Sequence, residues 1–158
     1  MGFVDAVRTC FAKYVTFSGR ARRPEFWWFV LFTVLAAVVA ALLDMALGFG
    51  AGDSGPVSLI VSLALTLPGI AAAWRRLHDV GRPGWFALAP NVAGAATGVL
   101  VFAMAASIDP QTGAPPLVFQ TLAALGGLAT LGLFVLLVVW LASKSQPGEN
   151  RFGPEPAA

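Results

Sequence analysis

The chain of 158 residues has the length of one domain, but its composition is not that of a soluble protein, since it is 58% hydrophobic and only 11% charged. The net charge of +2 is too small to argue for a nucleic-acid partner. One cysteine and one histidine exclude an intrachain disulfide and a zinc site built from those ligands, and we expect no metal and no cofactor.

The first segment carries apolar residues at helical spacing, namely Phe3, Val7, Cys10, Phe11 and Tyr14. This pattern predicts a short amphipathic helix. It either lies in the headgroup layer or packs on the cytoplasmic ends of membrane helices, and the sequence leaves both open. The first long apolar run begins only after about 25 residues and is too long for a signal peptide, so we expect an uncleaved anchor.

Four apolar runs follow, and each is long enough to cross a bilayer, which takes about 20 residues. The second run is interrupted by Pro68 and Gly69, which indicates a kink. The runs are apolar all round and lack the polar stripe of a soluble bundle. The sequence therefore predicts an all-α, polytopic membrane protein of one domain over residues 1–158, with a polar tail over 144–158 and spans at about 25–47, 56–74, 84–107 and 117–143.

The basic residues indicate the orientation of these spans. All ten lie before the first span, between the second and third, or after the fourth, whereas the two opposite loops hold only the acids Asp44, Asp53 and Asp109. By the positive-inside rule, both termini are cytoplasmic. The tryptophans agree, because an indole suits the membrane interface and all five lie at the same ends of the spans: Trp27, Trp28, Trp74, Trp85 and Trp140.

The loop "RRLHDVGRPGW" (75–85) concentrates charge in a chain that has little of it, and it faces the segment that enters the first span. Glu25 lies near the hydrocarbon edge, where we expect it to accept from an arginine of the other loop. If the helix of the second span continues through Asp79, that residue is within helical reach of both Arg75 and Arg76. The two segments bring six arginines to one level: Arg20, Arg22, Arg23, Arg75, Arg76 and Arg82.

Two interpretations of this arginine-rich face remain open. The arginines, with His78 and Arg151, bind anionic phospholipid headgroups or a protein partner, since a guanidinium matches phosphate oxygens bidentately. Alternatively, they only set the topology and form ion pairs with Glu25 and Asp79. The sequence also leaves open whether the chain forms a homo-oligomer.

No catalytic residue is expected. His78 and Asp79 are neighbours on a helix and point about 100° apart, and no nucleophile motif accompanies them. The competing class of function is a small transporter of an apolar or lipid-like cargo. In that case Pro68 and Pro90 would mark a hinge, and the intramembrane Asn91 a midplane site.

Three blocks, "FSGRARRPEFWWFVLF" (17–32), "RRLHDVGRPGWF" (75–86) and "GENRFGPEP" (148–156), resemble the DUF805 family of bacterial inner-membrane proteins. The resemblance implies a small multi-pass protein of the bacterial plasma membrane and brings no established activity. It also draws attention to the tail, where Asn150 and Arg151 would return to the face of the arginine loops. Whether the tail docks there or is disordered is left open. The motif positions are Gly19, Arg20, Arg23, Glu25, Trp27, Arg75, Arg76, His78, Asp79, Gly81, Trp85, Asn150, Arg151, Phe152 and Gly153.

Overall fold

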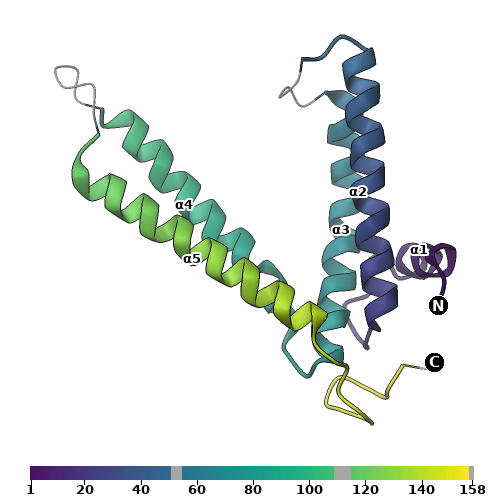
Figure 1. Cartoon of the computed structure of the whole chain (residues 1–158). Coiled ribbons are helices and arrows are strands. Elements are labelled where there is room, and N and C mark those ends of the chain that lie inside the picture. The colour runs from purple at the N-terminus through teal and green to yellow at the C-terminus, as the bar shows by residue number, and fades with distance from the viewer. Residues whose placement is uncertain (51–54, 109–114, 157–158) are drawn as a thin grey trace. The chain divides into compact units, whose positions relative to one another are not determined.

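The structure, a computed structural model, describes residues 1–50, 55–108 and 115–156, and the regular elements in these ranges are all helices. Four helical stretches are long and apolar enough to cross a membrane, which confirms the predicted all-α membrane fold (Figure 1). Asp53 and Asp109, used above to assign the orientation, lie outside the described residues. The elements are α1 (Phe3–Ala12), α2 (Arg23–Ala46), α3 (Pro56–Asp79), a 3-10 turn η1 (Gly84–Leu88), α4 (Ala89–Ala106) and α5 (Leu117–Ala142).

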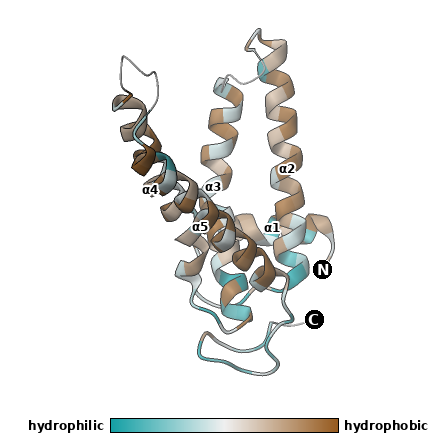
Figure 2. Cartoon of the chain, turned by 60° about the vertical axis from the view of Figure 1, so that its left-hand side comes forward, coloured by the Kyte–Doolittle hydropathy of each residue, from teal (hydrophilic) through white to brown (hydrophobic). Residues whose placement is uncertain are grey.

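The chain forms two compact units. The first comprises Met1–Gly84 together with Ser143–Ala158, which we call the tail from here on, and the second comprises Trp85–Ala142. The expectation of a single domain stays a prediction. The charged residues gather in the first unit, at the end of the α2–α3 hairpin that also holds α1 and the tail (Figure 2). We call this end the base.

The α2–α3 hairpin has a side-chain cap at the end opposite the base. Asp44, in the last turn of α2, accepts hydrogen bonds from the backbone N–H groups of Val57 (2.9 Å) and Ser58 (2.8 Å) in the first turn of α3. These groups have no partner inside their own helix. A Cβ at Gly55 would overlap the Asp44 carboxylate, so glycine permits this close approach. From the sequence, Asp44 was assigned only to an acidic loop, and this cap was not predicted.

Helix α1 packs on α2 near the base, and its position relative to the headgroup layer stays a prediction. Ala6 and Cys10 are buried, and the rings of Phe3 and Phe11 contact Trp28, Phe29 and Phe32 of α2.

The link after α1 is anchored at the proline of α3. Helix α3 runs through Pro68, which has no N–H to donate to the carbonyl of Ala64 one turn earlier. That carbonyl accepts from the hydroxyl of Tyr14 at 2.5 Å. The tyrosine therefore satisfies the backbone group that the proline leaves free, and it ties the N-terminal segment to the hairpin.

The second unit is a hairpin of α4 and α5. The two helices approach closely at Gly126, where a Cβ would meet Oγ1 of Thr97 at 2.7 Å. Near η1, the ring of Phe86 contacts Trp140 of α5 with centroids 5.0 Å apart. The amide of Asn91 donates to the carbonyl of Ala87 at 3.3 Å, within its own turn of chain.

Candidate functional site

Helix α3 carries four polar side chains into the base of the hairpin. It continues to Asp79, five residues beyond the expected end of the membrane span at Trp74. Its last turns therefore contain Arg75, Arg76, His78 and Asp79. All four are buried. The chain that enters α2 lies against them, since the N–H of Ala21 donates to the carbonyl of Arg75 at 3.0 Å.

Asp79 is the centre of this cluster. Its Oδ1 accepts from Nε of Arg20 at 3.0 Å, and its Oδ2 accepts from Arg76 and from Oγ of Ser145. The side chains of Arg20, Arg76 and Asp79 have no exposed surface. One carboxylate therefore holds together three segments: the chain before α2, the end of α3 and the tail.

Arg75 turns away from Asp79 and pairs with Glu25 in the first turn of α2, at 3.2 Å between Nη2 and Oε1. Its Nη1 donates to the carbonyls of Lys13 (3.2 Å) and Thr16 (2.7 Å), which fixes the link between α1 and α2. Nearby in α1, burial raises the pKa of the Cys10 thiol from an ordinary 9.0 to about 11, and the negative charge of Glu25 adds to the effect. Cys10 therefore stays a neutral, apolar residue.

The tail lies on the base and supplies carbonyl acceptors to the buried arginines. Arg20 donates through its terminal nitrogens to the carbonyls of Gln146 and Gly148, both at 2.5 Å, and Arg76 donates to that of Ser143. In return, the N–H of Gln146 donates to the carbonyl of Asp79 at 2.9 Å. The question that the sequence left open is answered by these contacts: the tail is docked.

His78 is covered by the tail. Its ring stacks on Phe152 with centroids 3.9 Å apart and planes 4° from parallel, while its Nδ1 lies 3.1 Å from the carbonyl of Gly19. The side-chain amide of Asn150 donates to the His78 carbonyl at 3.0 Å. One ring nitrogen is thus engaged and one ring face is occupied, an arrangement typical of a packed residue.

A tight turn gives the tail its shape. The N–H of Phe152 donates to Oδ1 of Asn150 at 2.9 Å, and Asn150 and Gly153 exchange backbone hydrogen bonds in an isolated bridge. Gly153 has φ of +130° and Gly148 has φ of +71°, values that glycine adopts without a steric penalty. The sequence "GENRFG" therefore forms a compact turn that presents Phe152 to His78.

Burial divides the eight residues proposed from sequence for binding. Arg20, Arg75, Arg76 and His78 are buried in the cluster. The other four remain at least partly accessible, and we call them the basic rim: Arg22, Arg23, Arg82 and Arg151. Within the described part of the chain, no group of three His, Cys, Asp or Glu residues could hold a metal ion.

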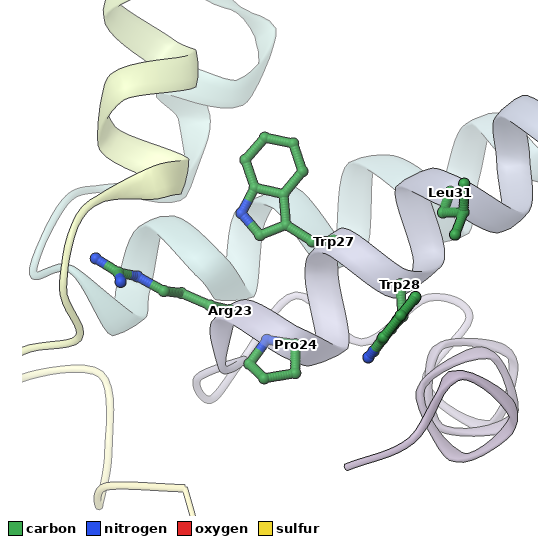
Figure 3. Close-up of a pocket in the computed structure, with 5 residues that line it drawn as sticks. All are labelled: Arg23, Pro24, Trp27, Trp28 and Leu31. Atoms are coloured by element: carbon green, nitrogen blue, oxygen red, sulfur yellow. The ribbon is translucent and has the colours of Figure 1, made fainter.

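A groove runs along α2 from the basic rim toward the apolar part of the helix. It has a volume of about 400 Å³ and is lined by Arg23, Pro24, Trp27, Trp28 and Leu31 (Figure 3). Arg23 marks its polar end. From the sequence, Trp27 and Trp28 were expected at the membrane interface, and the groove that they line with three other residues of α2 was not predicted.

Comparisons with known proteins agree on the membrane assignment. The family described as "Protein of unknown function (DUF805)" matches residues 14–154. The inner membrane protein YhaH of Escherichia coli K12 is 33% identical over 145 residues, which cover 91% of this chain and 89% of YhaH. The inner membrane protein YhaI of the same strain is 41% identical over 76 residues, which cover 48% of this chain and 62% of YhaI. No solved structure matches the chain.

Proposed function

The chain belongs to the DUF805 family and is an integral inner-membrane protein, and we propose that its basic rim binds the headgroups of anionic phospholipids. The observation that carries the proposal is the division of the arginines by burial. Arg20, Arg75 and Arg76 are buried among carboxylate and carbonyl partners. The rim residues remain at least partly accessible, although Arg22 and Arg23 each donate to a backbone carbonyl of the chain. Recognition of an external anion therefore falls to the rim.

The rim suits a phosphate for geometric and electrostatic reasons. Arg82 and Arg151 are exposed, and Arg22 and Arg23 are partly so. They lie around the base, at the ends of helices that are otherwise apolar. A guanidinium offers parallel N–H groups to two phosphate oxygens, and each basic residue near an anionic leaflet contributes about 1 kcal/mol.

We propose in addition that the base faces the cytoplasm, so that both termini are inside. The support is the positive-inside rule, since the basic residues of the chain lie before the first span, between the second and third, or after the fourth. Green fluorescent protein fused to the C-terminus should fluoresce, because it folds only on the cytoplasmic side, and alkaline phosphatase at the same position should be inactive. Active phosphatase there would reverse the orientation.

The headgroup proposal is tested by native mass spectrometry of the full-length protein released from mixed phosphatidylglycerol, phosphatidylcholine and phosphatidylethanolamine membranes. We expect the wild type to retain phosphatidylglycerol preferentially. The variant R22Q/R23Q/R82Q/R151Q should lose that preference while its helix content stays close to that of the wild type. Its thermal stability should fall slightly, because Arg22 and Arg23 each donate to a backbone carbonyl.

The matched control is R22K/R23K/R82K/R151K, which keeps the four charges and removes the planar fork. An intermediate preference in this variant would show that fork geometry contributes beyond charge. Equal retention of phosphatidylglycerol by the wild type and the glutamine variant would overturn the proposal and direct the search to a protein partner of the rim.

A further inference from the structure

We infer that the groove on α2 is a binding site for one anionic glycerophospholipid molecule, with its phosphate on Arg23 and an acyl chain along Trp27, Trp28 and Leu31. This inference rests on the proposed function and deepens it, because it assigns a defined site and stoichiometry to one part of the basic rim. We take phosphatidylglycerol as the lipid with which the site is tested.

The groove follows from the spacing of its residues on α2. Arg23, Trp27 and Leu31 stand four residues apart and form one row, and Pro24 and Trp28 form a second row beside it. Because a helix rises 1.5 Å per residue, the row from Arg23 to Leu31 is about 12 Å long. Figure 3 shows the five side chains in this order along the helix, from the guanidinium to the leucine.

The polar end is arranged to receive an anion. Nε of Arg23 donates to the carbonyl of Ser143 at 2.8 Å, which holds the guanidinium in place. Among the described residues, that bond is the only hydrogen bond of the Arg23 side chain, and no carboxylate lies within ion-pair distance of it. Its two terminal nitrogens are thus available as a fork, the arrangement that binds two phosphate oxygens.

The remaining walls are apolar and accessible. Trp27 and Trp28 are each 39% exposed, and Leu31 is 41% exposed. The ring of Phe3 from α1 lies edge-on to Trp28 with centroids 5.9 Å apart, so α1 restricts the movement of that indole. Indole rings favour the interface between headgroups and hydrocarbon, and Leu31 lies two turns deeper from Arg23.

The ligand class follows from the combination of these two ends. A water-soluble anion would use Arg23 and leave the apolar wall without a partner. A neutral hydrocarbon would cover the wall and leave the guanidinium without a counter-charge. A phospholipid satisfies both ends at once, and a net negative headgroup is favoured because no acid in the described part of the chain pairs with Arg23.

The test uses phosphatidylglycerol that carries a photoreactive diazirine in one acyl chain, incorporated into membranes with the full-length protein. After irradiation, mass spectrometry of peptides locates the label. We expect labelling of the peptide that contains Trp27, Trp28 and Leu31, and competition by unlabelled phosphatidylglycerol but not by phosphatidylcholine.

Two variants and two matched controls make the test specific. R23Q and R22Q each remove one charge and one arginine that donates to a tail carbonyl, but only Arg23 lines the groove. L31W and V34W each add an indole to an exposed position of α2, but only Leu31 lines the groove. R23Q should weaken labelling at least about tenfold more than R22Q, because it also removes a charge-assisted hydrogen bond. L31W should weaken it, and V34W should not.

Three outcomes would overturn the inference. Equal effects of R22Q and R23Q, with none from L31W, would leave headgroup binding to the rim as a whole and remove the defined site. Equal labelling by a phosphatidylcholine probe would make the groove an ordinary part of the lipid boundary. Cross-links between two copies of the chain, formed by a photoreactive amino acid placed at Trp27 or Leu31, would assign the groove to a dimer interface.

Discussion

Replacing Asp79 with asparagine should be strongly destabilising, although the two side chains have almost the same shape. In the structure the carboxylate accepts from Arg20, Arg76 and Ser145, and neither arginine side chain has any exposed surface. An asparagine places one N–H₂ group where only donors approach, and it leaves two buried guanidinium groups without a counter-charge. Breaking a buried ion pair on one side costs about 3–5 kcal/mol.

The magnitude can be checked by thermal unfolding in detergent, followed by circular dichroism. For a chain of this size, a loss of about 3–5 kcal/mol lowers the midpoint by roughly 6–20 °C. E149Q is the matched control, because Glu149 is an exposed acid of the tail and E149Q removes one negative charge, as D79N does. S145A, which removes one hydrogen bond to Asp79, should cost about 1 kcal/mol. Equal midpoints for D79N and E149Q would refute the view that Asp79 holds the base together.

Three further predictions concern single contacts in the first unit. F152A removes the ring stacked on His78, so the tail should become accessible to proteases while the helices stay folded, and unchanged cleavage kinetics would argue against the docked tail. Y14F leaves the carbonyl of Ala64 without its donor and should lower stability by about 1 kcal/mol in the same unfolding assay, whereas the exposed substitution V15A should have little effect. Cys10, with a pKa of about 11, should react with iodoacetamide at pH 8 about 100-fold more slowly than a thiol of pKa 9.0, because the thiolate is the reactive form. Alkylation at the rate of an accessible thiol would show that α1 is not packed on α2.

The sequence predicts the membrane-spanning helices well, because hydropathy depends only on composition within a window. From hydropathy, the second span was predicted to end at Trp74, where the apolar residues end, whereas α3 continues to Asp79. The residue at which a helix leaves the hydrocarbon core of the membrane need not be the residue at which the helix ends. The backbone hydrogen bonds of α3 continue into the polar layer, and the charged residues there are placed by the helix.

Pairing within the arginine cluster was only partly accessible to sequence reasoning. Helical spacing allowed Asp79 to pair with Arg75 or Arg76, and an interaction of Glu25 with the other loop was expected from its position at the hydrocarbon edge. The structure has Arg76 on Asp79 and Arg75 on Glu25. The choice depends on the rotation of α3 about its axis relative to α2, and residue spacing within one helix does not contain that information.

The composition of the tail explains why it can complete the base. Three buried arginines offer more donors than the two carboxylates of Glu25 and Asp79 can accept, so the remaining donors need other acceptors. A helix uses its carbonyl groups internally, whereas a segment rich in glycine and proline keeps them free. The carbonyls that receive Arg20 and Arg76 belong to such a segment. The composition of the tail alone would indicate disorder. The same composition suits the tail to this position, because its free backbone carbonyls supply the acceptors that the buried guanidinium groups require.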